Sequence, residues 1–170
     1  MFQKKICLLG AFAAGKTSLV RQFVHTQFSE RYQTSLGVKV DTKVLQANGH
    51  DLTLLIWDVH GQDHYQAINP KFIKGASGYL IVIDGTRSET LDVAKEVHSK
   101  AKEILGDVPF LVLVNKDDIN NSWVLDDDAF AEMDEMNWDV RRTSAKTGAH
   151  VEDVFQELAN RIVSDVPDSN

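Results

Sequence analysis

Four apolar runs of strand length recur along the chain, separated by segments with helical periodicity. The runs are Lys5–Leu9, Leu52–Trp57, Tyr79–Ile83 and Phe110–Val114. They lack the alternation of apolar and polar residues that marks a half-exposed strand, so they predict strands buried on both faces. The more polar run Thr34–Ala47 does alternate and predicts an edge strand, and Asn48-Gly49 predicts a hairpin turn into the next strand. A sixth strand is expected around Trp138–Arg142.

Amphipathic segments lie between and after these runs. The predicted helices are Thr17–His25, Ser88–Leu105, Asp126–Met136 and Val151–Val163. Ser88 is expected to cap the second helix, and the acids Asp126, Asp127 and Asp128 are expected to stabilise the N-terminus of the third rather than to bind a metal or a partner. Because strands alternate with helices, the sequence predicts an α/β fold with about six strands in a mostly parallel sheet and helices on both faces.

The length of 170 residues fits one domain, residues 1–170. With 18 Lys and Arg against 25 Asp and Glu, the net charge of −7 opposes general binding to nucleic acid or to an anionic membrane. The single cysteine, Cys7, cannot form an internal disulfide, which suits a reducing compartment. Apolar runs stay well short of the roughly 18 residues of a membrane span, and the C-terminal VPDSN offers no cysteine for a lipid. We therefore expect a cytoplasmic chain without a membrane anchor, and peripheral attachment only through a lipidated tail beyond it.

The first apolar run leads into a loop that matches the phosphate-binding pattern G-x-x-x-x-G-K-[ST]. The loop reads Gly10-Ala-Phe-Ala-Ala-Gly15-Lys16-Thr17. Such a loop points successive backbone N–H groups at phosphate oxygens, and the positive end of the following helix adds to the attraction. Lys16 would contact the β- and γ-phosphates, and the Thr17 hydroxyl would bind Mg²⁺. The other candidates for nucleotide contact in this segment are Phe12, Ala13, Ala14, Gly15 and Ser18.

Two further signatures follow predicted strands and extend this site. In Asp58-Val-His-Gly61-Gln62, Asp58 can hold Mg²⁺ through water, the Gly61 N–H can meet a γ-phosphate, and Gln62 can orient an attacking water. In Asn115-Lys116-Asp117-Asp118, the Asp118 carboxylate can accept two N–H bonds from guanine, which adenine does not offer, while the Lys116 stem covers the base.

A last polar signature, Thr143-Ser144-Ala145-Lys146, follows the final strand. A backbone N–H of this loop could bond the guanine O6, and Ser144 could brace Asp118. All these signatures stand at the carboxyl ends of predicted parallel strands, where doubly wound sheets place their ligands.

Taken together, the motifs resemble those of the small GTPases of the Ras superfamily, nearest the Rab branch. The resemblance spans about residues 4–163 and includes Ile56-Trp57-Asp58 and the segment from Asn69 to Ala76. It implies a P-loop NTPase G domain that binds GTP and GDP with Mg²⁺, hydrolyses GTP to GDP and phosphate, and signals to effectors through two switch segments. The site residues that it implies are Gln62 and Lys16 for catalysis, Thr17, Ser35 and Asp58 for Mg²⁺, and Phe12, Ala13, Ala14, Gly15, Lys16, Thr17, Ser18, Phe28, Ser35, Gly61, Asn115, Lys116, Asp118, Ser144, Ala145 and Lys146 for the nucleotide.

In and before switch I the resemblance leaves three assignments open. Ser35 takes the position of the family's Mg²⁺-binding threonine, with Thr34 as the alternative hydroxyl. Phe28 matches the aromatic that lies edge-on to guanine, or else makes a core contact. Arg31 could act as an arginine finger from within the chain, although its spacing to Gly37 is one residue off that pattern.

Other positions depart from the family pattern. Phe12 replaces a small residue beside the γ-phosphate, so we expect slow hydrolysis and a poor response to an arginine-finger activator. Ala13 replaces a glycine, which costs about 1 kcal/mol if its φ is positive. His60 replaces a small residue and either contacts the γ-phosphate, alters the movement of switch II or points to solvent; a zinc site with His64 is not expected because no cysteine is near. Rab proteins dock effectors with an aromatic triad: Trp57 and Phe72 match two of its members, but Val40 stands where a phenylalanine is expected, which places effector binding through that surface in doubt.

Two other functions are compatible with these residues. The chain could be a guanine-nucleotide-dependent binding module with negligible turnover, given Phe12 and Ser35, or a P-loop phosphotransferase acting on a small substrate. The guanine signatures argue against the second. The expected partners are guanine nucleotide, protein effectors and regulators, such as an exchange factor and an activating protein, and no nucleic acid.

Overall fold

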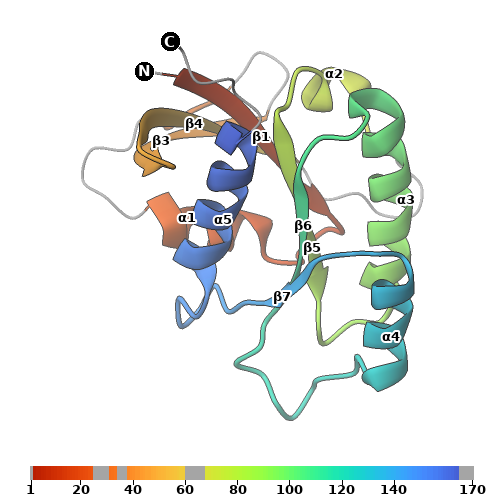
Figure 1. Ribbon diagram of the computed structural model, residues 1–170. Helices are drawn as coiled ribbons and strands as arrows, with labels where there is room; N and C mark the ends of the chain where they lie inside the picture. The colour runs from red at the N-terminus through yellow and green to blue at the C-terminus, as the bar shows by residue number, and fades with distance from the viewer. Residues whose placement is uncertain (1, 25–30, 34–37, 60–67, 165–170) are drawn as a thin grey trace.

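The computed structural model describes residues 2–24, 38–59 and 68–164, together with the backbone of residues 31–33. The strands of the described part form one seven-stranded sheet in the order β2-β3-β4-β1-β5-β6-β7 (Figure 1). Their bounds are Phe2–Gly10 for β1, Arg31–Gln33 for β2, Lys39–Ala47 for β3, His50–Asp58 for β4, Gly78–Asp84 for β5, Phe110–Asn115 for β6 and Val140–Arg142 for β7. β3 pairs antiparallel with β2 and β4, whereas β4, β1, β5, β6 and β7 run parallel. The predicted α/β class and mostly parallel sheet are confirmed.

The antiparallel edge of the sheet, formed by β2 and β3, differs from the prediction in one respect. The expected edge strand over residues 34–47 begins at Lys39, and the three-residue β2 pairs on its outer side, so β3 is the second strand and β2 the edge. Residues 34–37 lie outside the described part of the chain. The predicted hairpin turn is present: Asn48 and Gly49 have φ of 47° and 81° and connect the paired Ala47 and His50. Positive φ at both positions is what a two-residue hairpin loop requires.

The helices are α1 (Lys16–Val24), α2 (Pro70–Ile73), α3 (Glu89–Leu105), α4 (Asp127–Glu135) and α5 (Val151–Ser164). The four predicted helices are confirmed, and α2 is a short addition. The Asp126 side chain accepts a hydrogen bond from the Ala129 N–H at 3.0 Å, so this acid does cap α4. Ser88 precedes α3 but makes no capping bond with its side chain. Its helical backbone (φ −62°, ψ −31°) explains the error, because a capping serine needs an extended conformation.

Alternate residues of the buried strands pack into two separate cores. On one face, Ile6 and Leu8 of β1 join Phe23 of α1 and Phe155 of α5, whose rings stack 4.1 Å apart. On the other face, Cys7 and Leu9 of β1 join apolar residues of α3 and α4. Figure 1 shows α1 and α5 on one side of the sheet and α3 and α4 on the other. The unbroken apolar runs of the sequence therefore reflect strands that feed a core on each side.

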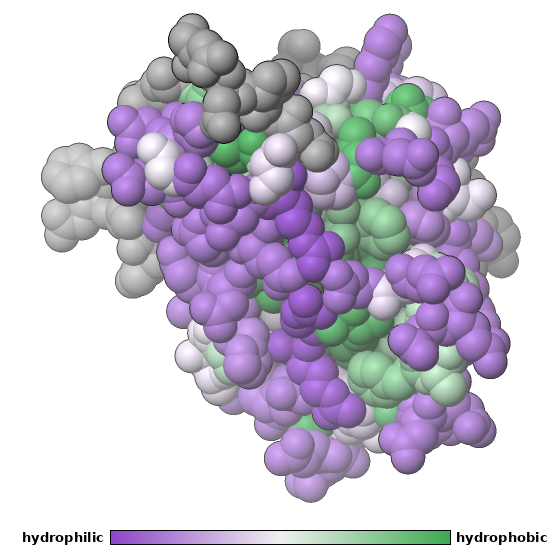
Figure 2. Space-filling view, viewed as in Figure 1, coloured by the Kyte–Doolittle hydropathy of each residue, from purple (hydrophilic) through white to green (hydrophobic). Residues whose placement is uncertain are grey.

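The space-filling view shows hydrophilic side chains over most of one face, with hydrophobic ones along its middle, between the two helical layers (Figure 2). In the described part of the chain, none of the helices has the length and apolarity to cross a bilayer. Because β1, β5 and β6 are parallel, their carboxyl ends Gly10, Asp84 and Asn115 open onto the same edge of the sheet. The loops that carry the predicted motifs therefore meet there.

Burial makes the only cysteine of the sequence a probe of core opening. Cys7 is fully buried, and burial raises the pKa of its thiol to about 12. Since the thiolate is the reactive form, we expect the native protein at pH 8 to react with a disulfide reagent at least about a hundredfold more slowly than the protein unfolded in urea. The exposed variant Ser99→Cys should label at once at its new thiol. Prompt labelling of Cys7 in the native wild type would contradict this packing.

Candidate functional site

The phosphate-binding loop lies between β1 and α1, in the strand–loop–helix context that its sequence predicts. Lys16 is 5% exposed, and its ammonium donates to the carbonyls of Gly10 and Ala11, each at 3.0 Å. These two bonds leave one of its three donors for a phosphate oxygen. Burial lowers the pKa of Lys16 to about 8, so the charged form still predominates at pH 7. The loop thus fixes the Lys16 ammonium through two of its own carbonyls.

A cavity of about 400 Å³ opens at this loop. It is lined by Phe12, Ala13, Gly15, Lys16, Thr17, Ser18, Asp58 and Lys116. The Thr17 hydroxyl donates to Oδ2 of Asp58 at 2.5 Å, which places a neutral and an anionic oxygen side by side next to Lys16. Mg²⁺ prefers such oxygen ligands and usually takes only one or two carboxylates together with phosphates and water. The residues present therefore fit a phosphate-bound magnesium ion.

A second cavity of about 310 Å³ adjoins the first through Gly15, Ser18 and Lys116. Its other lining residues are Asn115, Asp118, Ile119, Ala145 and Lys146. The Ser144 hydroxyl donates to Oδ1 of Asp118 at 2.6 Å, so the predicted brace is present. An ionised carboxylate has about four acceptor positions, and Asp118 thus keeps capacity for two further N–H donors. This arrangement suits the N–H edge of a guanine base.

Asn115 joins the loops that form the two cavities. Its Nδ2 donates to the Ala14 carbonyl at 3.1 Å, and its Oδ1 accepts from the Thr143 hydroxyl and the Ala145 N–H, both at 3.2 Å. The amide is 1% exposed. The sequence suggested this residue only as part of a base-binding motif, whereas the structure shows that it also fixes the phosphate-binding loop.

Two residues at the end of β5 also belong to the site and were not predicted. Asp84 is fully buried, and its Oδ2 accepts from Lys116 at 2.6 Å and from Arg87 at 3.0 Å. Burial alone would raise the pKa of Asp84, but hydrogen bonds from Lys116, Thr86 and Arg87 outweigh it and hold the pKa below its ordinary value. The sequence does contain a signal for this part of the site. Asp84-Gly85-Thr86-Arg87 is a polar segment at the carboxyl end of a buried parallel strand, as the predicted nucleotide motifs are.

Several predicted site residues lie outside the described part of the chain. They are Phe28, Thr34, Ser35, His60, Gly61, Gln62 and His64. Arg31 is described only as backbone in β2. Their assigned roles stay predictions. Within the described ranges, no group of three or more His, Cys, Asp or Glu side chains is arranged to hold a metal ion.

The structure describes the three positions that the resemblance assigns to an effector-binding triad, Val40, Trp57 and Phe72. Val40 is fully buried in β3, opposite Trp57 of β4. Trp57 and Phe72 are half-buried, and the Lys5 ammonium lies 3.7 Å from the centre of the Trp57 ring while donating to the Lys74 carbonyl. The Lys5 ammonium therefore covers part of the Trp57 indole.

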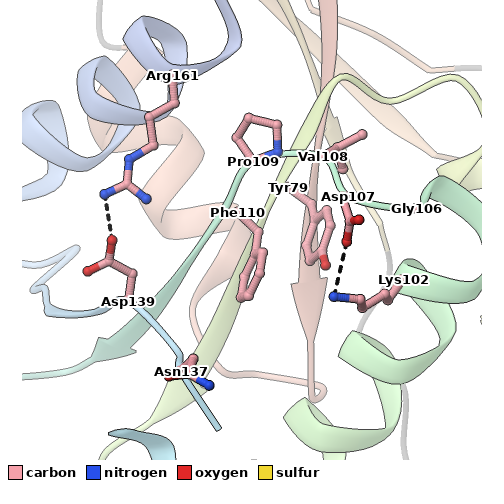
Figure 3. A pocket seen from close by; sticks show the side chains of 10 residues that line it. All are labelled: Tyr79, Lys102, Gly106, Asp107, Val108, Pro109, Phe110, Asn137, Asp139 and Arg161. Carbon is pink, nitrogen blue, oxygen red and sulfur yellow. Dashed lines mark hydrogen bonds and ion pairs between the residues drawn. The ribbon is translucent and has the colours of Figure 1, made fainter. Parts of the chain in front are cut away.

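A third cavity, of about 340 Å³, lies at the opposite edge of the sheet, where β5 and β6 begin (Figure 3). Its charged residues pair with one another: Lys102 with Asp107 at 3.1 Å and Arg161 with Asp139 at 2.5 Å. The ring of Tyr79 stacks on that of a neighbouring phenylalanine 5.2 Å away. The charged groups of this cavity are thus paired with one another, whereas the predicted nucleotide motifs lie at the carboxyl edge.

The site combines a phosphate-binding loop after the first strand, an oxygen pair that fits a divalent cation, and a carboxylate that is held by Ser144 and fits a guanine base. These are the features of an α/β protein that binds guanine nucleotides. Comparison with known proteins agrees. A family model described as "Ras family" matches residues 5–164. The chain therefore belongs to the Ras family and is a small GTPase.

The most similar relatives include Rab proteins from distant organisms. Rab-7b of Mus musculus is 33% identical over 161 residues, covering 92% of this chain and 81% of that protein. Rab-21 of Geodia cydonium is 33% identical, covering 97% and 73%, and Rab5 of Nicotiana tabacum is 33% identical, covering 98% and 84%. The predicted resemblance to the Rab branch is confirmed, and with it nucleotide binding and dependence on regulators or effectors in general terms.

Gly15 lines both cavities, and because it has no side chain it leaves room for Asn115. It has φ of +104°, and a Cβ there would lie 2.1 Å from Nδ2 of Asn115. We expect Gly15→Ala to displace Asn115 and lower GDP affinity at least tenfold, measured by competition against a fluorescent GDP analogue. Gly106→Ala is the matched control: φ is +71°, but nothing lies within 4 Å, so it should cost about 1 kcal/mol of stability and leave affinity unchanged. Equal affinities for Gly15→Ala and wild type would contradict the prediction.

Proposed function

We propose that this chain is a Mg²⁺-dependent GTP/GDP switch that hydrolyses GTP slowly because Phe12 occupies the mouth of the phosphate cavity. The observation that carries the proposal is the position of this residue: its side chain lines the cavity beside Lys16 and Thr17 and is 70% exposed. A phenyl ring so exposed makes few contacts that hold it elsewhere. It stands where an attacking water and an activator's arginine have to approach.

The binding step rests on the described residues. Lys16 contributes one free N–H and a positive charge to the β- and γ-phosphates, and the loop contributes backbone N–H groups. Thr17 would hold Mg²⁺ directly and Asp58 through water, with Ser35 as the switch I ligand. The metal, when bound, neutralises charge that develops on the phosphate oxygens.

The hydrolytic step depends on placing water in line with the γ-phosphate. Gln62 orients that water in this proposal, and Lys16 stabilises the charge on the transferred group. An arginine from an activating protein accelerates such reactions by about 10³- to 10⁵-fold when it reaches the same oxygens. In this proposal the Phe12 ring hinders both the attack of that water and the entry of that arginine, so the intrinsic and the stimulated rates are low.

The base subsite supports guanine over adenine. Asp118 is held by Ser144, and Lys116 and Ala145 border the same cavity. This favours a GTPase over the alternative of a phosphotransferase on a small substrate, since the cavity is built for a guanine edge. Effectors are proposed to bind across switch I, switch II and the surface around Trp57 of β4 and Phe72 of α2, both of which are partly exposed, whereas Val40 is buried.

Replacing the phenyl ring tests the proposal directly. In single-turnover assays of phosphate release, we expect Phe12→Gly to raise the intrinsic rate several-fold. An arginine-finger activator of a Rab protein should then accelerate the variant by about a hundredfold or more, while wild type responds little. Val44→Ala, which trims another exposed apolar side chain (62% exposed, in β3), is the control and should behave as wild type.

Two outcomes would overturn the proposal. If Phe12→Gly and wild type hydrolyse GTP at the same rate with and without activator, Phe12 does not limit the reaction. If both bind GTP but release no phosphate above background, the chain is a nucleotide-dependent binding module.

A further inference from the structure

Arg87 connects the end of β5 to the phosphate-binding loop. Its Nη2 donates to the Phe12 carbonyl at 2.5 Å, while its Nε donates to Oδ2 of the buried Asp84 at 3.0 Å. Lys116 makes the parallel connection one residue further on: its ammonium donates to the Ala13 carbonyl at 3.2 Å and to the same Asp84 oxygen at 2.6 Å. Two cations anchored on one carboxylate thus hold two consecutive carbonyls of the loop.

The direction of these carbonyls decides where the neighbouring N–H groups point. In a trans peptide the C=O and the N–H of the same unit point in opposite directions. Holding the Phe12 carbonyl toward Arg87, which does not line the phosphate cavity, therefore turns the Ala13 N–H the other way, to the cavity that Phe12, Ala13 and Lys16 do line. An N–H so placed is a donor for a phosphate oxygen.

Ala13 needs such support more than a glycine would. Its φ is +58°, the left-handed region, in which an alanine is disfavoured by about 1 kcal/mol. The expectation of strain at this residue is confirmed. A hydrogen bond from a charged donor to the adjacent carbonyl is large enough to offset that strain.

The turn that carries Arg87 is itself fixed. The Arg87 carbonyl accepts from the hydroxyl of the buried Thr90 at 2.7 Å, and the Val124 N–H donates to the Gly85 carbonyl at 2.9 Å. The Trp123 ring packs on Gly85 so closely that a Cβ there would lie 2.1 Å from it. Arg87 is therefore presented to the loop from a rigid support.

We propose that Arg87 is a positioning residue for the phosphate-binding loop, which, anchored on Asp84, turns the Phe12–Ala13 peptide so that the Ala13 N–H binds a nucleotide phosphate. Arg87 contacts no ligand in this role. The inference rests on nucleotide binding by the loop and is independent of the hydrolysis rate assigned to Phe12.

The test compares a ligand that has phosphates with one that has none. Dissociation constants of GDP and of guanosine are measured by competition against a fluorescent GDP analogue. We expect Arg87→Met to weaken GDP about tenfold and to change guanosine less than twofold, because only GDP uses the loop. Equal losses for both ligands would indicate a general disturbance of the fold, and unchanged GDP affinity would show that the bond is dispensable; either result overturns the proposal.

Two further variants test whether the effect requires the geometry of the Arg87 side chain, rather than its charge alone or the loss of any surface arginine. Arg87→Lys keeps the charge but lacks the planar fork that bonds Asp84 and Phe12 together, so it should weaken GDP at least about threefold. Full GDP affinity in Arg87→Lys would mean that Arg87 acts only as a positive charge. Arg161→Met is the matched control, since Arg161 is as exposed as Arg87 (37% against 35%) and also pairs with carboxylates, Asp139 and Glu157, but lies at the opposite edge of the sheet. It should leave the ratio of GDP to guanosine affinity at the wild-type value, and a change there as large as that of Arg87→Met would also count against the proposal.

Discussion

The buried amide of Asn115 is the interaction on which the whole site depends. Its Nδ2 and Oδ1 together bond the phosphate-binding loop and the loop after β7, while its backbone ends β6. Removal of the Asn115 amide would take this partner from the Ala14 carbonyl and the Ala145 N–H, at about 1–3 kcal/mol for each group left buried and unsatisfied. Gly15 has no side chain at the place where Asn115 needs room. The phosphate and base subsites are therefore a single unit, and nucleotide binding at one end is coupled to the geometry of the other.

Positive charge is concentrated at the phosphate-binding loop, although the chain as a whole is acidic. The chain carries a net charge of −7, yet Lys16, Lys116 and Arg87 converge on the loop that receives the phosphates. Asp84 makes this density of positive charge tolerable, because its buried carboxylate offsets one of the two positive charges of Lys116 and Arg87 and fixes the direction of both side chains. Long-range repulsion of an anionic ligand is screened over about 10 Å, whereas these contacts act at hydrogen-bond distance and in a partly desolvated setting. Net charge is thus a poor guide to the ligand of a GTPase.

The phosphate-binding loop of this chain carries side chains at two positions, Phe12 and Ala13, where the family resemblance leads one to expect small residues or glycine. Ala13 adopts a conformation that glycine adopts without strain, and Phe12 adds a large apolar group that the fold does not bury. Substitutions that run against local preference are expected at functional sites, where the surrounding structure enforces the conformation. Here the enforcement is visible in the bonds to the Phe12 and Ala13 carbonyls. A loop held from outside by cations has less need of glycine inside it.

The sequence by itself determined the fold class, the positions of the buried strands and most of the phosphate and base motifs. It could do so because burial on both faces leaves an unbroken apolar run, and because the loop from Gly10 to Thr17 is local: its strand, turn and helix are contiguous. The tertiary structure alone decided that β2 forms the sheet edge, that Val40 is buried, and that Ser88 does not cap its helix. It also decided the roles of Asp84 and Arg87. Those roles arise from contacts between residues about 30 and 75 positions apart, which only the pairing of parallel strands brings together, and no short-range pattern encodes them.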